Sequence, residues 1–252
     1  MKKIFTTTFV VIICAIHLNA QSVTLKFNNL FNGSPIEFGK HYQTPLGDSV
    51  TFSTLNYFIS NIQLVNTNGK VYTVPQDSSY FLLKQADPAS TSIQLNNIPA
   101  GEYNSVQFTV GVDSIRNTMD VSKRTGSLDV GAAARGMYWV WNSGYIFFKL
   151  EGKTLNDVDS LKKNFRYHIG GYGGYETKTI NNIKTKKFVL NNIAIATAKK
   201  LKIEVNVSID QFFNAITPIR ILEHPSVMWG NFSVKIADNY ETIFNIGNIS
   251  YE

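Results

Sequence analysis

Apolar and polar residues alternate along several short stretches of the chain. In "LKIEVNVSI", residues 201–209, every odd-numbered position is apolar and every even-numbered position is polar. Successive side chains of a β-strand point to opposite faces, so this period of two predicts a strand with one buried face. The same alternation predicts strands in "SVTLKF", "VQFTVGV" and "FSVKI".

Between these stretches the chain carries turn signals and few helical ones. Asn32-Gly33, for example, favours a tight turn between antiparallel strands. The helical candidates are short: "TLNDVDSLKK", residues 154–163, and "IDQFFNAI", residues 209–216. Many short strands with turns between them are typical of a β-sandwich or barrel. We therefore predict an all-β fold, a single β-sandwich-like domain of mainly antiparallel strands with one or two short helices.

The first 20 residues have the layout of a secretory signal peptide. Lys2 and Lys3 precede the apolar run "FVVIICAI", and the small residue Ala20 stands before polar sequence. We expect a signal peptide over 1–20, a β domain over 21–252, and a periplasmic or secreted location. No apolar stretch reaches the roughly 20 residues that a membrane-spanning helix needs, so we expect no transmembrane segment.

Loss of these 20 residues changes the chemistry open to the protein. It removes the single cysteine, Cys14, together with two lysines and no acid, so the formal charge falls from +6 to +4. Without a thiol, the remaining chain forms neither a disulfide nor a thiolate metal site. A modest positive charge spread along the chain does not indicate a nucleic-acid surface, and we expect no nucleic-acid partner.

Three histidines remain as candidate metal ligands: His41, His168 and His224. His168 ranks first, because it directly precedes the glycine-rich aromatic stretch "GGYGGY" within "FRYHIGGYGGY". No two histidines have the close spacing of a helical zinc motif, so a metal site would have to be assembled from distant strands. A lone histidine is more often a structural residue than a ligand.

Catalytic signatures are missing from the sequence. The glycines of "GGYGGY" do not match a phosphate-binding loop, because no G-x-G-x-x-G spacing and no helix start accompany them. No nucleophile-elbow motif is found either. We therefore expect a protein that is not an enzyme.

A tryptophan pair stands in "GMYWVWNSGYIFFKLEG", residues 136–152. Alternation places Met137, Trp139 and Trp141 on one face, and the following Asn-Ser-Gly predicts a turn or bulge. The segment is then a hairpin or a bent strand, with both indoles near a loop end, where binding sites gather. If the pair only fills the core, replacing either residue with Phe changes stability and nothing else.

Five stretches, taken in chain order, resemble the blocks of the MbnP-like copper-binding proteins. They are "LNYFISNIQL", "IPAGEYNSVQFTVGVDSIRN", "GSLDVGAAARGMYWVWNSGYIFFKLEG", "FRYHIGGY" and "SVMWGNFSVKIADNYETIFNI". This exported family is related to the methanobactin-associated protein MbnP and to the copper proteins MopE and CorA. Its characterised members hold one copper ion with histidine nitrogens and a kynurenine, a tryptophan whose five-membered ring has been opened by oxidation. The modifying partner in such systems is a di-haem peroxidase of the MauG type.

The resemblance implies a copper site, for Cu(I) or Cu(II), in this chain. It places the modifiable tryptophan at Trp139 or Trp141 and a first ligand at His168, with His41 or His224 as a further ligand. Trp139 is preferred, because some relatives carry a histidine two residues after the converted tryptophan, where Trp141 stands here. The implied role is copper acquisition or handling in the periplasm or outside the cell, with a MauG-like di-haem peroxidase as partner.

A metal-free alternative stays open: an extracellular module that binds a glycan or a protein. Tyr172, Tyr175, Trp139 and Trp141 would then line an aromatic surface on which a ligand stacks. Aromatic side chains also suit strand interiors, so their abundance alone does not decide. Stoichiometric copper separates the two functions.

Overall fold

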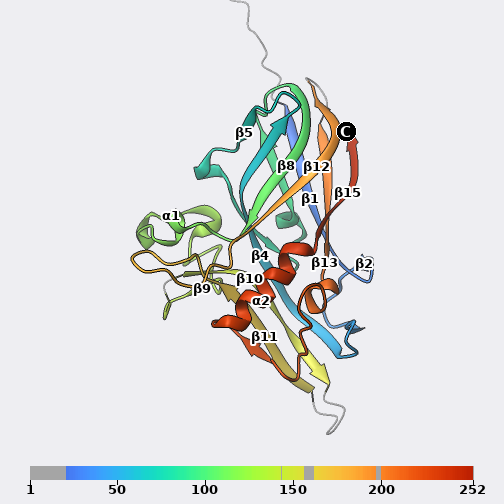
Figure 1. The fold of residues 1–252 in the computed structure, drawn as a ribbon, viewed down its shortest axis with the longest axis vertical. Helices are drawn as coiled ribbons and strands as arrows, with labels where there is room; N and C mark the ends of the chain where they lie inside the picture. Colours follow the sequence, from blue (N-terminus) through green and yellow to red (C-terminus); the bar gives the residue numbers. More distant parts are fainter. Residues whose placement is uncertain (1–20, 143, 156–161, 197–199, 252) are drawn as a thin grey trace, which may run out of the picture.

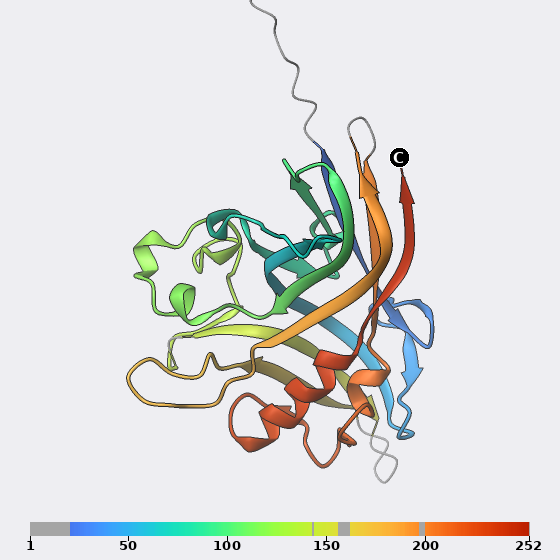
Figure 2. The ribbon, with the colours of Figure 1, turned by 45° about the horizontal axis from the view of Figure 1, so that its top comes forward.

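The computed structural model describes residues 21–142, 144–155, 162–196 and 200–251. Within them, a five-stranded and a ten-stranded β-sheet face each other across a common core (Figures 1 and 2). The smaller sheet has the order β15-β13-β1-β2, with β7 also paired to β1. Its strands are β1 (Ser22–Phe31), β2 (Ser34–Pro35), β7 (Ser92–Asn96), β13 (Leu201–Ser208) and β15 (Phe244–Tyr251).

The larger sheet has the order β12-β8-β4-β10-β11-β14, and short strands pair with its two middle strands, β4 and β10. Its main strands are β4 (Ser49–Asn66), β8 (Gly101–Val110), β10 (Gly144–Leu155), β11 (Lys162–Gly170), β12 (Lys184–Ile195) and β14 (Ser226–Val227). The short strands are β3 (His41–Gln43), β5 (Val71–Thr73) and β6 (Tyr80–Lys84), paired with β4, and β9 (Tyr138–Trp139), paired with β10.

Strand pairing confirms the predicted fold class. Only β1 with β13 and β11 with β14 run parallel among the described pairs, and the others are antiparallel. In β13, Leu201 and every second residue after it are buried, while the intervening residues are partly exposed, as the alternation predicts. The predicted turn at Asn32-Gly33 closes the β1–β2 hairpin, with both residues at positive φ.

The strand predicted for "FSVKI" is wrong, because these residues open helix α2 (Asn231–Thr242). Five residues fit the period of two, but the buried positions Ser233, Ile236, Ala237 and Tyr240 recur at the three- and four-residue spacing of a helix. The pattern over the whole of residues 231–242, and not over five residues, therefore identifies the helix. Helix α2 lies against β11, β12 and β15 and closes one part of the core (Figure 1).

The two helical predictions have different outcomes. Within residues 209–216, a short 3-10 helix forms at Gln211–Phe213. The helix predicted over 154–163 is wrong at its ends, since β10 runs to Leu155 and β11 begins at Lys162, and its middle lies outside the described residues.

The remaining helical segments are short. They are α1 (Ser114–Asn117) and 3-10 turns at Gln76–Ser78, Pro88–Thr91, Val121–Lys123 and Gly126–Leu128. In the described ranges, no helix combines the length and apolar character needed to cross a membrane. The predicted signal peptide, residues 1–20, lies outside the described residues.

Apolar side chains form two clusters on opposite faces of the larger sheet. The inner core fills the space between the two sheets. The second, which we call the outer cluster, contains Trp139, Tyr145 and Phe147 and lies beneath residues 112–142, which cross the outer face of this sheet (Figure 2). Its remaining buried members are Phe58, Tyr80, Leu82, Val112, Leu128, Ala134, Met137 and Ile146.

Candidate functional site

The β9–β10 hairpin carries the tryptophan pair, as predicted. Trp139 pairs with Gly144 across the hairpin, and Trp141 lies in the turn between the strands. Their rings are in contact, with centroids 5.3 Å apart, yet Trp139 is 4 % exposed and Trp141 is 64 % exposed. The two indoles therefore share one side of the hairpin, but only Trp139 is part of the outer cluster.

Trp139 packs directly on the backbone of β11. A Cβ atom added to Gly170 would lie 2.8 Å from Cζ3 and 3.1 Å from Cη2 of this indole, so its six-membered ring occupies the place of a side chain at 170. The Nε1–H group of Trp139 is buried and has no hydrogen-bond partner among the described residues. An unpartnered buried donor costs about 1–3 kcal/mol.

The third tryptophan, Trp229, joins the pair from a distant part of the sequence. Its ring centroid lies 6.1 Å from that of Trp139, with the two planes almost perpendicular. It packs against Gly171, where an added Cβ would come within 3.1 Å of its Cζ3. Sequence reasoning did not place Trp229 in the site, because only the pairing of β14 with β11 brings it there and no periodic pattern announces that pairing.

His168 lies two residues before Gly170 and so on the same, outer face of β11. Its Nε2 is 2.7 Å from Oε1 of Glu151 on β10. Burial lowers the pKa of His168 below its ordinary value of 6.5, although the hydrogen bond to Glu151 opposes this. Burial raises the pKa of Glu151, but hydrogen bonds from Thr54 and His168 and the charge of Lys149 outweigh it and bring that pKa below 4.5.

These pKa directions assign the two ring nitrogens of His168 at neutral pH. An ionised carboxylate only accepts hydrogen bonds, so Nε2 of the neutral ring carries the hydrogen and donates to Glu151. Nδ1 then keeps its lone pair, and it has no hydrogen-bond partner in the described part of the chain. A carboxylate on one ring nitrogen, with the other nitrogen free, is the arrangement that orients metal-binding histidines.

The other two candidate histidines do not lie beside His168. His41, on β3, pairs with Thr51 of β4, so β4 and β10 separate it from β11, and at the usual strand spacing it is at least about 14 Å from that strand. The ring of His224 instead packs on Phe232 of α2, with centroids 3.7 Å apart. Among the described residues, no three His, Cys, Asp or Glu side chains are grouped as metal ligands. A second histidine ligand thus stays a prediction without support from the geometry.

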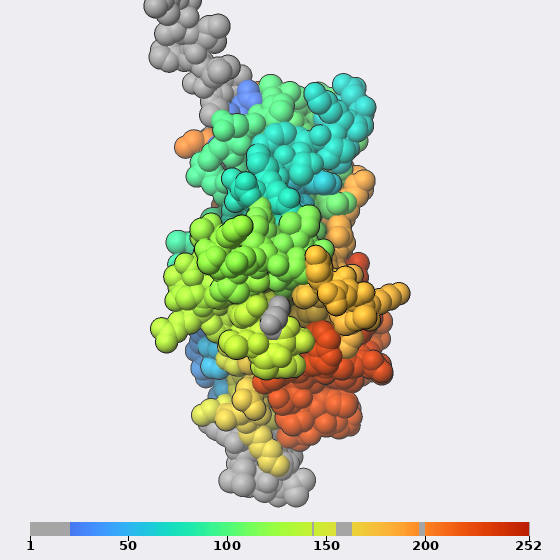
Figure 3. Space-filling model, turned by 90° about the vertical axis from the view of Figure 1, so that its left-hand side faces the viewer, coloured from blue at the N-terminus to red at the C-terminus, as the bar shows by residue number. Residues whose placement is uncertain are grey.

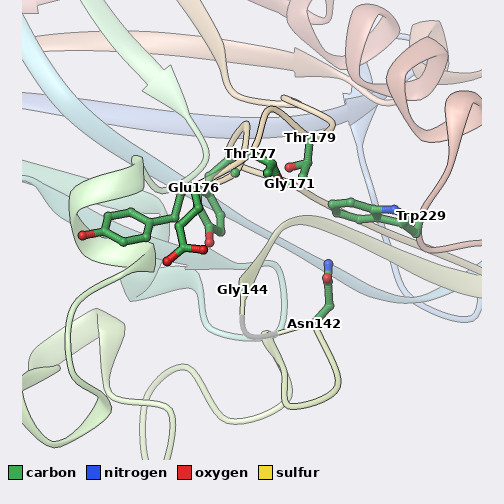
Figure 4. A pocket seen from close by; sticks show the side chains of 10 residues that line it. Asn142, Gly144, Gly171, Glu176, Thr177, Thr179 and Trp229 are labelled. Carbon is green, nitrogen blue, oxygen red and sulfur yellow. The ribbon is translucent and has the colours of Figure 1, made fainter.

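A hollow of about 300 Å³ opens beside Trp229. It is lined by the β9–β10 turn and the loop after β11: Asn142, Gly144, Gly171, Tyr172, Gly174, Tyr175, Glu176, Thr177, Thr179 and Trp229. Figure 4 shows the Trp229 ring reaching toward Gly171 and Thr179, with Asn142 pointing toward that ring from the hairpin turn. The same two segments meet on one face of the molecule in Figure 3.

The glycine-rich loop folds tightly on itself beside the hollow. Gly174 has a φ of +84°, and an added Cβ would lie 1.9 Å from the carbonyl oxygen of Thr177, so only glycine fits there. Tyr175 is 79 % exposed at the loop, whereas Trp229 is 38 % exposed. The surface beside the buried Trp139 therefore offers aromatic faces and polar groups together.

A family model described as MbnP matches residues 20–229 of the chain. Among solved structures, MbnP from Methylosinus trichosporium is similar to the chain over 90 % of this chain and 98 % of that chain, with a TM-score of 0.58 and 15 % sequence identity. At this identity the likeness shows a shared fold. No curated protein sequence matches the chain. The family match spans most of the chain and confirms the resemblance that the five sequence blocks indicate.

Proposed function

We propose that this chain, which belongs to the MbnP family, binds copper outside the cytoplasm through His168 and a kynurenine formed from Trp139. One observation carries the proposal: His168 and the indole of Trp139 lie on the same face of the sheet. His168 is hydrogen-bonded to a carboxylate, and the buried indole, whose nitrogen has no partner among the described residues, packs on Gly170, two positions further along β11. The role is copper acquisition or handling, in the periplasm or outside the cell, and the signal-peptide pattern of residues 1–20 supports that location.

The donor set suits copper. Imidazole is a good ligand for this metal, and Nδ1 of the neutral His168 ring is the nitrogen left to bind it. An intact indole is no ligand, because its nitrogen only donates a hydrogen bond. Oxidative cleavage of the Cγ–Cδ1 bond of Trp139 by the partner peroxidase and its peroxide, with one oxygen added to each carbon, gives an N-formyl group. Hydrolysis then removes Cδ1 as formate and would leave Nε1, which is buried without a partner, as an aromatic amine that can bind a metal.

The modification requires a partner, because no side chain in the described residues is an oxidant for an indole. We propose that a MauG-like di-haem peroxidase oxidises the tryptophan, and we propose no catalytic turnover for the chain itself. Trp139 is nearly buried, whereas Trp141 contacts its ring and is exposed. A docking partner would therefore meet Trp141 before Trp139.

Copper content of protein isolated from its native host, grown with ample copper, tests the proposal. The wild-type chain should carry stoichiometric copper, and His168→Ala should lose it. His41→Ala and His224→Ala are matched controls, since both remove an imidazole elsewhere in the fold, and both should keep the metal. Copper retained by His168→Ala would refute the site, and a wild-type chain without copper would refute the function.

The hollow beside Trp229 favours a second candidate function, the binding of a saccharide. Trp229 and Tyr175 offer exposed ring faces for stacking, and Glu176 and Asn142 offer hydrogen-bonding groups. Titration with glucose, galactose, N-acetylglucosamine and their trisaccharides should then change the tryptophan fluorescence of the metal-free protein. Trp229→Ala should abolish the change while His168→Ala preserves it. No response to any of these sugars would exclude this candidate.

A further inference from the structure

A second hollow, of about 360 Å³, lies between the start of β6 and residues 116–128. Among the described residues that line it there is neither a histidine nor a tryptophan. We infer that this hollow binds a small organic carboxylate, which the guanidinium of Arg116 and the ammonium of Lys123 hold. The site shares no residue with the proposed copper site and does not depend on copper.

The wall of this hollow carries more positive than negative charge. Arg116, Lys123 and Arg124 line it, and Asp77 is the one acid among the described lining residues. A hollow lined by charges of one sign concentrates ions of the opposite sign. Its ligand is therefore an anion.

Arg124 is the buried part of this charge, since it is only 6 % exposed. Its Nε and Nη2 donate to the carbonyl oxygens of Asn117 and Met119 at 2.7–3.1 Å. Its Cζ lies 4.9 and 5.1 Å from the ring centroids of Tyr138 and Tyr145. No carboxylate of the described chain forms an ion pair with it. Burying a charge without a counter-charge costs free energy, and an anion in the hollow would lower that cost.

The two guanidinium groups have hydrogen-bond donors to spare. Nη1 of Arg124 and Nε of Arg116 are buried and have no partner among the described residues. Nη1 of Arg116 donates to the sulfur of Met119 at 3.5 Å, and a thioether is a weak acceptor. A ligand oxygen is a much stronger acceptor for such a group, because charged donors and acceptors form the strongest hydrogen bonds.

The ion pair between Arg116 and Asp77 indicates which anion fits. Nη2 of Arg116 donates to Oδ1 of Asp77, so this guanidinium already binds a carboxylate. The Arg116 side chain is 14 % exposed and lies over the ring of Tyr80, whereas the Asp77 side chain is 91 % exposed. Arg116 is thus fixed in the wall, and Asp77 is a solvated partner that a ligand carboxylate can replace.

Apolar side chains form the rest of the wall, which favours an organic ligand over an inorganic ion. Tyr80, Phe81, Met119 and Leu128 line the hollow together with the cations. Phe81 and Met119 are partly exposed and so available for contact. Apolar walls with a few polar groups are typical of sites for small organic molecules.

A purely structural role of Arg124 is the competing explanation, because its bonds to two carbonyl oxygens hold residues 117–124 together. Calorimetric titration of the metal-free protein with benzoate separates the two. Benzamide, which has the same shape without the charge, is the matched ligand control. We expect benzoate to bind with a Kd of about 1 mM or below and benzamide to give no binding.

Three variants test the wall of the hollow. Arg116→Gln should weaken benzoate binding at least about tenfold, since it removes a hydrogen bond between two charged groups. Lys123→Gln should weaken it by a smaller factor, because this side chain is exposed. Asp77→Asn should strengthen it, since it removes the carboxylate that competes for Arg116.

Two exposed residues elsewhere supply the protein controls. Lys187→Gln and Glu223→Gln make the same changes of net charge outside the hollow and should leave the affinity unchanged. If Arg116→Gln does not fold, Lys123→Gln and Asp77→Asn still decide, because both replace exposed side chains. The inference is wrong if benzoate does not bind up to about 10 mM, if benzamide binds equally, or if Asp77→Asn fails to strengthen binding. Changes of the same size in the control variants would overturn it as well.

Discussion

The two faces of the β10–β11 pair are built from alternate residues of the same strands, yet they differ in kind. On the inner face, Phe148 and Tyr167 are fully buried, and Phe148 stacks at 5.3–5.5 Å on the rings of Tyr57, Phe212 and Tyr240. The outer face carries the His168–Glu151 pair and an indole laid over a glycine.

This difference shows how the pleat of a sheet separates stability from ligand chemistry. The inner face offers large apolar area and stacked rings, which favour folding. On the outer face, burial of His168 opposes its protonation, and the unpartnered Nε1–H of Trp139 costs free energy in the metal-free chain. Perturbed groups of this kind collect at functional sites. Substitutions on the inner face should therefore lower the free energy of unfolding, whereas substitutions on the outer face should lower copper binding.

The largest expected effect on stability comes from the inner face. Phe148→Ala removes the ring that stacks on Tyr57, Phe212 and Tyr240, and it should lower the free energy of unfolding by about 3–5 kcal/mol. Urea denaturation measures this loss. The variant molecules that fold should still bind copper. If Phe148→Ala loses less unfolding free energy than an outer-face variant does, the proposed difference between the two faces is wrong.

Gly170→Ala should have the next largest effect, because it acts where the outer face meets the backbone. The added Cβ would lie 2.3 Å from the carbonyl oxygen of Tyr145 and 2.8 Å from the Trp139 ring. We expect a loss of about 1–3 kcal/mol from overpacking, together with a red shift of fluorescence as Trp139 moves toward solvent. Gly131→Ala is the control, since its Cβ would meet only a side-chain oxygen, at 3.4 Å. Equal losses of stability and equal fluorescence shifts in the two variants would contradict the close packing of Trp139.

The two members of the tryptophan pair should respond differently. Trp139→Phe should cost about 1 kcal/mol of stability and also abolish copper binding, since it removes the nitrogen of the buried ring. Trp141→Phe should change stability by less than about 0.5 kcal/mol, because this indole is 64 % exposed, and should retain the metal. If Trp139→Phe lowers stability but leaves copper binding unchanged, the tryptophan pair only fills the core and is not part of a metal site.

The smallest expected effect is a pH dependence in the metal-free protein. The pKa of His168 is lowered by burial, so the unfolded chain takes up its proton near pH 6.5 while the folded chain resists it. The free energy of unfolding should therefore be highest above pH 6.5 and fall as the pH drops toward the folded pKa. His168→Gln should flatten this slope. A His168 pKa above 6.5, measured by NMR titration, would contradict it.

Sequence patterns predicted the strands well where one face of the sheet is buried, because a period of two is then imposed over many residues, as in 201–209. They missed helix α2, because the five residues of "FSVKI" fit both periods. Trp139 and His168 were identified from their blocks. Glu151 and Trp229 were not, because their place in the site depends on which strands pair, and pairing is decided by contacts between distant segments.

The most direct test of the account is peptide mass spectrometry of copper-loaded protein from the native host. Cleavage after Arg135 and Lys149 releases one peptide, residues 136–149, that holds both Trp139 and Trp141. We predict the mass of a kynurenine, with fragment ions that place it at Trp139. Two intact indoles in protein from cells with ample copper and an active peroxidase would contradict the proposed site.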